Sequence, residues 1–243
     1  MAETAIPRPT RWRRRKLARP GEILGAALAC FAERGFAATR LDEVARRAGV
    51  TKGTLYLYFS NKEELFQAVV RQALVPNIER AEALLDDADQ PAPQLLARLL
   101  RGWADLASSP AGALPKIVIA ETGNFPDLAR FYRKEVVDRG IALLRRVLEI
   151  GVVRGEFCDV DIDSTVHCLV APLLLAMLWR HSFGRLDPGG PDPDALCDAH
   201  LRLLLNGLTV WPAAATVAQE EERPVPSSTL AAAPSPTFHM RGR

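Results

Sequence analysis

Metal-ligating and redox-active residues are scarce in this sequence. Its 243 residues include four cysteines and four histidines. The cysteines, at positions 30, 158, 168 and 197, form no CxxC pair, and no histidine has another three or four residues further on. Zinc sites and disulfide frameworks are built from such closely spaced residues. We therefore expect no metal and no structural disulfide, which suits a reducing compartment.

Local motifs for catalysis are also missing. The chain has no glycine-rich phosphate loop and no nucleophile elbow, so the enzyme hypothesis has no residues to support it. No secretory signal is evident, and the most apolar run, His167 to Trp179, contains Pro172 and is shorter than the roughly 20 residues of a membrane span. We predict a cytoplasmic protein without cofactor or membrane partner.

Positive charge is concentrated at one end. Residues 1–62 contain 13 Lys/Arg and 5 Asp/Glu, whereas residues 63–243 contain 18 and 24. A basic small domain on an acidic larger one is typical of a protein that binds polyphosphate at one end only. Residues 1–18 form a basic arm, expected to be disordered, which either stays solvated or follows DNA phosphates. Residues 212–243, with five prolines, are expected to be a disordered tail.

Apolar spacing predicts helices in the basic region. Two segments carry apolar residues at i, i+3, i+4 and i+7, the pattern of one buried helix face: Leu24, Ala27, Leu28 and Phe31, then Leu41, Val44, Ala45 and Ala48. Pro20 suits the first turn of the first helix. Gly35 and Gly49 supply the left-handed backbone that ends these helices. The second helix and the one after Gly49 are joined by a tight turn, as in a helix-turn-helix.

Capping residues mark the expected helix starts. Thr39 is expected to cap the second helix and Thr51 the third. Ser60 and Glu63 are predicted to form a capping box at the start of a further helix. Residues 52–54 are then left at the exposed N-terminal end of the third helix, where a helix-turn-helix protein contacts DNA bases.

This stretch closely resembles the DNA-binding domain of the TetR/AcrR family of bacterial transcriptional regulators. The residues that match the family pattern are Gly35, Phe36, Thr39, Leu41, Val44, Ala45, Ala48, Gly49, Val50, Thr51, Gly53, Leu55, Tyr56, Tyr58, Phe59, Lys62, Glu63 and Leu65. The resemblance implies an all-α fold. It places a three-helix helix-turn-helix domain at residues 19–66 and a larger helical ligand-binding and dimerisation domain at residues 67–211.

The resemblance, together with helix geometry, divides the DNA-binding roles among nine residues: Thr39, Arg40, Thr51, Lys52, Gly53, Thr54, Tyr56, Tyr58 and Lys62. Lys52, Gly53 and Thr54 are expected to reach base edges, since lysine donates to guanine O6 and N7. The others are expected to contact phosphates. Arg40 departs from the small polar residue that is commoner in the family, and would add a phosphate contact. Tyr56 and Tyr58, two residues apart, cannot both point inward.

The remainder of the chain is predicted to be helical. The expected segments are Asn61 to about Pro76, continuing with a kink to Leu85, then Gln94–Ser108, Ala113–Glu121, Asp127–Gly151, Asp163 to about His181, and Asp194 to about Leu208. A turn is expected at residues 154–157, and loops at 86–93 and 184–193. Proline and glycine interrupt the pattern at each break.

The family implies a four-helix dimer interface made by the last two helices and their copies. On this chain the assignment falls on Leu173, Leu174, Met177, Leu178, Leu196, Leu203 and Leu204. The penultimate helix is apolar on every face, and such a helix must be covered on both sides. The alternative is a helix buried within a monomer. Two half-sites one helical turn apart favour the dimer.

The family also implies a small-molecule cavity in the larger domain. The inward-facing candidates are Trp103, Phe131, Tyr132, His167 and Trp179, each of which is also compatible with an ordinary core role. Glu121, which ends an apolar run, is a further candidate and equally suits a surface or helix-end carboxylate. An apolar pocket with few polar groups suits a small hydrophobic effector.

Two functions are therefore carried forward. The first is a homodimeric repressor that binds a near-palindromic operator in double-stranded DNA and is released by a small molecule. The second is a DNA-binding protein of the same fold whose larger domain binds a protein partner, or only itself, without an inducer. A binding protein or enzyme that has lost DNA binding is disfavoured by the intact Lys52-Gly53-Thr54 and Lys62.

Overall fold

The computed structural model describes residues 11–86, 89–184, 186 and 189–209, with side chains from residue 20 onward. These residues are helical almost throughout, and the described part contains one isolated β-bridge, between Phe157 and Thr209. The all-α prediction is therefore confirmed. The first ten residues and the tail after residue 209 lie outside the described residues, and so do the predictions made for them.

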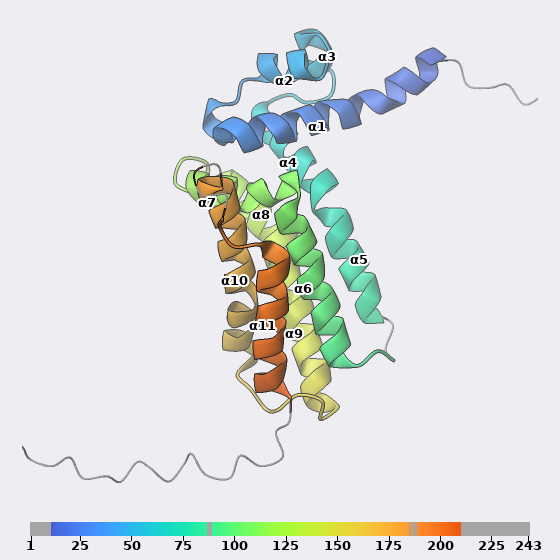
Figure 1. The fold of residues 1–243 in the computed structure, drawn as a ribbon. Coiled ribbons are helices and arrows are strands. Elements are labelled where there is room, and N and C mark those ends of the chain that lie inside the picture. The colour runs from blue at the N-terminus through green and yellow to red at the C-terminus, as the bar shows by residue number, and fades with distance from the viewer. Residues whose placement is uncertain (1–10, 87–88, 185, 187–188, 210–243) are drawn as a thin grey trace, which may run out of the picture. The chain divides into compact units, whose positions relative to one another are not determined.

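The N-terminal helices are α1 (Arg11–Ala38), α2 (Leu41–Arg47), α3 (Lys52–Tyr56) and α4 (Lys62–Ala73) (Figure 1). Helix α1 begins eight residues before the predicted start at 19, so residues 11–18 belong to a helix and Pro20 lies inside it. Its regular path is broken at Gly35, where φ is +79°, and Gly49 ends the next helix with φ +66°. Both glycine predictions are confirmed, because few other residues adopt this left-handed backbone.

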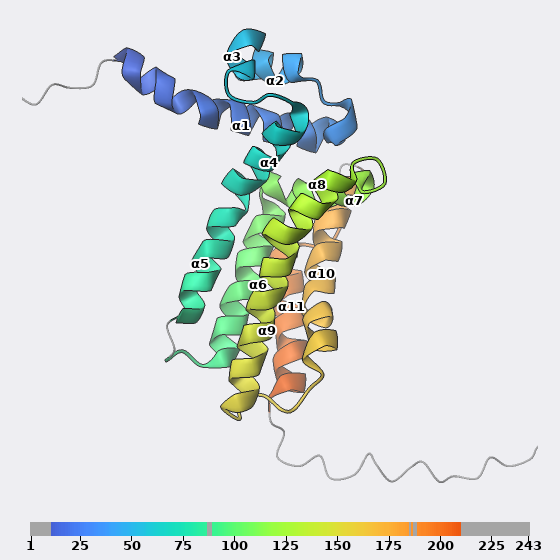
Figure 2. The same ribbon diagram turned by 180° about the vertical axis from the view of Figure 1, so that it is seen from behind.

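The larger part of the chain is built from α5 (Val75–Asp86), α6 (Ala92–Ser108), the 3₁₀ turn η1 (Pro110–Ala113), α7 (Leu114–Glu121), α8 (Pro126–Tyr132), α9 (Asp138–Val153), α10 (Ile162–Phe183) and α11 (Pro193–Leu208). Helices α6, α9, α10 and α11 lie side by side in both views (Figures 1 and 2). The predicted kink after α4 is present at Leu74, followed by Pro76 in the first turn of α5.

The predicted helix from Asp127 to Gly151 is interrupted. A π-helical turn, η2 (Arg133–Val137), separates α8 from α9. Such turns are rare and often occur at functional sites, because they add a residue to the helical path and redirect the side chains around it. Here Val136, within η2, lines the cavity described below.

One hydrophobic core extends across the predicted domain boundary at residue 66. Buried residues of α1 to α4 belong to the same cluster as residues of η1, α7 and α8. Phe36 is fully buried at its centre, with ring centroids 5.4 Å from Phe66 and 4.8 Å from Phe125. Helix α4 runs without a break through the boundary, so the helix-turn-helix and the larger part share their packing at this junction.

Helix α10 is longer than predicted. It spans 22 residues and, by length and composition, could cross a membrane. This one helix is weak evidence for a membrane span, because a core helix of a soluble protein has the same length and composition. The helix packs against α7, α9 and α11, yet only 28% of its most apolar 18-residue window is buried. The expectation that it is covered on both sides is not met within one chain.

Gly151 in α9 provides a test of the core. A Cβ at this position would overlap the ring of Phe157, which is 2% exposed. We expect Gly151→Ala to destabilise the protein by about 1–3 kcal/mol, because the ring cannot move without disturbing the core. The matched control is Gly25→Ala in α1, where a Cβ meets no atom within 4 Å and helix propensity favours alanine by about 1 kcal/mol. Urea unfolding of both variants measures the difference, and equal stabilities would contradict this packing.

Candidate nucleic-acid interface and effector cavity

Helix α3 presents its N-terminal end to solvent. Thr51 caps it as predicted: its Oγ1 accepts a hydrogen bond from the backbone N–H of Thr54 at 3.1 Å. Thr51, Lys52 and Gly53 are exposed, and Leu55 is fully buried. The buried leucine anchors the helix, while its uncapped N–H groups and the lysine ammonium face outward. This arrangement suits contact with an anion or a base edge.

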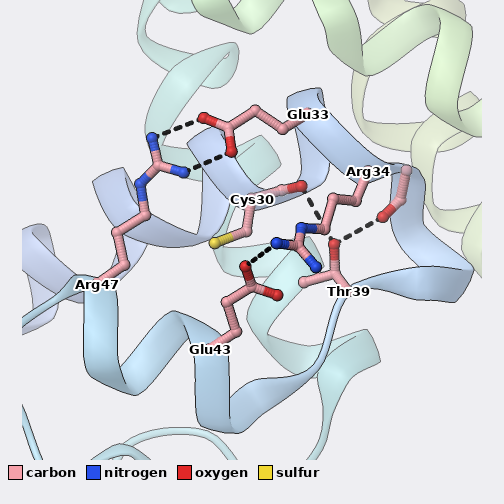
Figure 3. Close-up of polar contacts among 7 residues, drawn as sticks. Cys30, Glu33, Arg34, Thr39, Glu43 and Arg47 are labelled. Carbon is pink, nitrogen blue, oxygen red and sulfur yellow. Dashed lines mark hydrogen bonds and ion pairs between the residues drawn. The ribbon is translucent and has the colours of Figure 1, made fainter.

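Two ion pairs brace α2 against α1 (Figure 3). Arg47 forms a bidentate contact with Glu33, with both distances 2.7 Å, and Arg34 lies 2.7 Å from Glu43, whose side chain is 16% exposed. Bidentate pairs add geometric specificity to their energy. Cys30 lies between the pairs, and burial raises the pKa of its thiol, so it is core filler as expected. The brace fixes the helix that precedes α3.

Thr39 does not cap α2. The N-cap is Arg40, whose side chain makes no capping bond. Thr39 is 2% exposed, and its hydroxyl donates toward the carbonyls of Gly35 at 2.7 Å and Cys30 at 3.2 Å. The buried hydroxyl satisfies carbonyls freed where α1 breaks, so it does not face a phosphate. Arg40 is exposed and free to do so.

The other predicted DNA contacts are differently placed. Tyr56 is 46% exposed, whereas Tyr58 is half-buried and packs against the core, as their spacing required. Lys62 is half-buried: its Nζ donates to the carbonyl of Ala37 at 2.8 Å and lies 4.7 Å from the centroid of the Phe36 ring. Two of its ammonium hydrogens remain for a phosphate. Leu57, which the sequence analysis did not select, is 82% exposed beside Tyr56.

The cap of α4 is shifted by one residue from the prediction. Asn61, and not Ser60, accepts from the N–H of Glu64 at 2.7 Å. Glu64, and not Glu63, reaches back to accept from the N–H of Ser60 at 2.8 Å, which lowers the pKa of Glu64. Asparagine accepts the capping bond as well as serine does, but the bond in return comes from the residue before the cap, so the arrangement differs from a full capping box.

A cavity of about 840 Å³ lies among α4, α5, α6 and α9. Its walls are mostly apolar, with Leu74, Ile78, Leu100, Trp103 and Leu144 among the lining residues. The polar and charged residues that line it are Asn77, Arg80, Arg98, Asp105 and Ser109. This volume is within the range of small-molecule sites, which combine apolar walls with a few polar groups.

Of the residues predicted to hold an effector, only Trp103 lines this cavity. Glu121 ends α7 and its Oε1 accepts from the N–H of Ala37 at 3.0 Å, so it links α7 to the end of α1. The Phe131 ring lies under the guanidinium of Arg71 at 4.8 Å. His167 is exposed, and Trp179 packs on Phe183; Tyr132, a further candidate, is buried at 6% exposure. The cavity is assembled from separate helices, which spacing along one helix does not indicate.

An apolar surface is exposed on α10 and α11. Leu175 is 57% exposed and Leu203 is 74% exposed, and Leu174, Leu178, Leu196 and Leu204 are half-buried. Leu173 and Met177 are at 0% and 4% exposure, so they pack inside their own chain and are not available to a partner. The outward face of α10 is therefore centred on Leu175, which was not predicted, because a helix apolar all round has no pattern that distinguishes its faces.

Two family models match the chain. The family described as "Bacterial regulatory proteins, tetR family" matches residues 23–69, and "Tetracyclin repressor-like, C-terminal domain" matches residues 95–192. The chain belongs to the TetR family. It is thus a member of a family of DNA-binding transcription regulators, and the first match covers the braced helix-turn-helix described above.

Relatives and solved structures agree with this membership. The HTH-type transcriptional repressor KstR2 of Mycolicibacterium smegmatis is 27% identical over 202 residues, covering 79% of this chain and 91% of that protein. The regulator FadR from Bacillus subtilis, solved with stearoyl-CoA, superposes with a TM-score of 0.65 at 23% identity, over 77% of this chain and 98% of FadR. A putative regulator from Saccharomonospora viridis, solved with choline, gives 0.68 at 20% identity, over 81% and 100%. At these identities the two structures establish the fold alone.

The buried hydroxyl of Thr39 gives a test of the corner between α1 and α2. We expect Thr39→Val to lower the free energy of unfolding by about 1–2 kcal/mol, because valine keeps the shape and leaves buried carbonyls without a donor. Thr122→Val, which removes an exposed hydroxyl bonded to the carbonyl of Ile119, should change it by less than about 0.5 kcal/mol. Denaturant unfolding measures both, and similar effects would contradict the structural role given to Thr39.

Proposed function

We propose that this TetR-family protein is a homodimeric repressor that leaves its operator when a small apolar compound occupies the cavity. The observation that carries the DNA-binding part is the exposed N-terminal end of α3, held on a buried leucine and a braced α2. In a helix-turn-helix this end enters the major groove. Lys52, Gly53 and Thr54 then face base edges, and Arg40, Thr51, Tyr56 and Lys62 lie nearer the phosphates.

The exposed apolar face of α10 and α11 supports a dimer. Leu175 and Leu203 are each more than half exposed, and large apolar side chains exposed on two packed helices are typical of an interface. A second copy of the same face would cover it with matching chemistry, as two-fold interfaces do. Two α3 helices would then contact half-sites about 34–36 Å apart, which is one turn of DNA.

Helix α4 connects the cavity to the DNA-binding helices. Its C-terminal residue Ala73 lines the cavity, and so does Leu74 just after it. At its other end Lys62 and Phe66 pack on Phe36. A helix of 12 residues is a rigid lever about 18 Å long. An effector that prefers the cavity with α4 displaced would move the two α3 helices out of register, to the extent of its differential affinity.

The apolar walls and the volume of the cavity suit a hydrophobic effector with a polar end, which the polar side chains Asn77, Arg80 and Asp105 could face. Relatives solved with stearoyl-CoA and with choline support small-molecule binding as such. No observation favours the alternative function, a regulator without an inducer. A cavity of this size favours the regulator that responds to one. We place the protein in the cytoplasm, where its DNA is.

The dimer and the operator can be tested together. We expect the wild-type protein to protect a near-palindrome with two half-sites in DNA upstream of its own gene, and to sediment at twice its mass of 26.6 kDa. Leu175→Glu should sediment as a monomer, because burying an unpaired carboxylate costs about 3 kcal/mol or more, and its footprint should require at least tenfold more protein. Val153→Glu, at an 86% exposed position on α9, is the control. A monomeric wild type, or an unchanged Leu175→Glu, would overturn the proposed interface.

The cavity is tested by filling it. Gly140 lines the cavity, and a Cβ there would lie 3.8 Å from Cζ2 of Trp103, in ordinary contact. We expect Gly140→Leu to bind operator DNA normally, while binding the dye 1-anilinonaphthalene-8-sulfonate at least about tenfold more weakly, since the site that holds it is occupied. Gly25→Leu, on the exposed side of α1, should retain one dye site per protomer. Fluorescence titration measures both, and equal affinities would mean that the dye, as an effector substitute, does not enter this cavity.

A further inference from the structure

An acidic side chain lies beside the residue expected to read DNA bases. Asp42 belongs to the first turn of α2, and its Oδ1 is 2.8 Å from Nζ of Lys52, the first residue of α3. The two side chains are 53% and 58% exposed. The contact lowers the pKa of Asp42 and raises that of Lys52, so both are charged at neutral pH. Wherever Lys52 meets DNA, this carboxylate is within a few ångströms.

Stability does not account for this ion pair. The neighbouring pairs, Arg47 with Glu33 and Arg34 with Glu43, join α2 to α1, and Glu43 is largely covered. The pair of Asp42 and Lys52 is more than half exposed on both sides, and exposed pairs contribute little to folding. A carboxylate on a surface that approaches phosphates also opposes binding. Its position therefore suggests a role in how DNA is contacted.

The geometry of an ammonium group indicates that role. Lys52 has three N–H donors, and Asp42 engages one of them. Two remain, which is the number needed for O6 and N7 of one guanine. A lysine without such a partner has a flexible four-carbon stem and follows the nearest phosphate as a point charge. The Tyr56 ring, with its centroid 5.9 Å from Nζ, bounds the same space from within α3.

We propose that Asp42 is a positioning residue that directs the Lys52 ammonium to guanine and holds it away from phosphates. The proposal rests on the placement of α3 in the major groove under the proposed function. The Asp42 carboxylate lowers the affinity of the protein for DNA in general and raises its discrimination at one base pair in each half-site. Specificity is a difference between affinities, and a repulsive element that weakens the wrong contacts raises it.

Removing the charge should therefore have two opposite effects. In Asp42→Asn only a neutral amide acceptor remains beside Lys52, so the ammonium reaches a phosphate more readily and binding to unselected DNA should strengthen about threefold or more. Its salt dependence should steepen by about 0.9 in log–log slope for each phosphate gained. The preference for guanine at one position should fall by about five- to tenfold, the low end of what a well-placed base contact supplies.

The test uses the full-length protein and a pool of 40-base-pair duplexes with a random centre. Wild type, Asp42→Asn, Asp42→Glu, Lys52→Ala and the control Glu22→Gln, an exposed acid on α1, each select from the pool. Base frequencies are read by sequencing, and affinity for the unselected pool is measured over a range of salt concentrations. We expect Asp42→Glu to retain most of the guanine preference, because it keeps the charge, and Glu22→Gln to leave base frequencies unchanged.

The outcomes distinguish a failure of this proposal from a failure of the proposed function on which it rests. If Lys52→Ala leaves every base preference unchanged, the placement of α3 is wrong and both proposals fail. If Lys52→Ala removes a guanine preference and Asp42→Asn does not, only the role of Asp42 is overturned. The same conclusion follows if Asp42→Asn binds all duplexes more tightly by one common factor, as an ordinary surface acid would. Asp42→Ser, also suited to a helix N-terminus, repeats the test should the asparagine variant unfold at a lower temperature than wild type.

Discussion

The buried ring of Phe36 is the contact on which both parts of the described chain depend. It packs against Phe31 and Phe66 in the helix-turn-helix and against Phe125 beyond α7, and the Lys62 ammonium lies over it. The ring reaches this position because Gly35, at φ +79°, turns the chain just before it. Around the same corner, Thr39 satisfies the carbonyls released by that turn. The position of this one aromatic side chain thereby determines where α2 begins and in which direction α4 runs.

This junction joins the helix-turn-helix to the helices that line the cavity. The Ala37 peptide is held from two sides, by Glu121 at its N–H and by Lys62 at its carbonyl. Glu121 belongs to α7 and Lys62 to α4, the helix whose other end reaches the cavity. Because interiors are close-packed, a displacement of α4 cannot be absorbed locally. Under the proposed function, this packing is the route by which a change in the larger part would reach the DNA-binding helices.

Three ion pairs described above connect helices α1, α2 and α3, and they differ in what they do. The contacts of Glu33 and Glu43 cross from α1 to α2 and fix the position of the helix-turn-helix. The contact of Asp42 lies at the exposed end of α3. An ion pair adds little stability there, and a carboxylate lowers the affinity for DNA most. Net positive charge in the first 62 residues supplies attraction, and selected acids limit where that attraction is directed.

The sequence by itself determined the helix-turn-helix, the left-handed glycines, the cap at Thr51 and the family, since these depend on residues close together in the chain. Only the tertiary structure decided that Thr39 points inward, that Glu121 meets Ala37, and that Trp103 alone of its predicted group lines the cavity. The physical reason is that burial and cavity walls arise between elements distant in sequence. In α10, apolar on every face, only packing against α9 and α11 separates buried Leu173 from exposed Leu175.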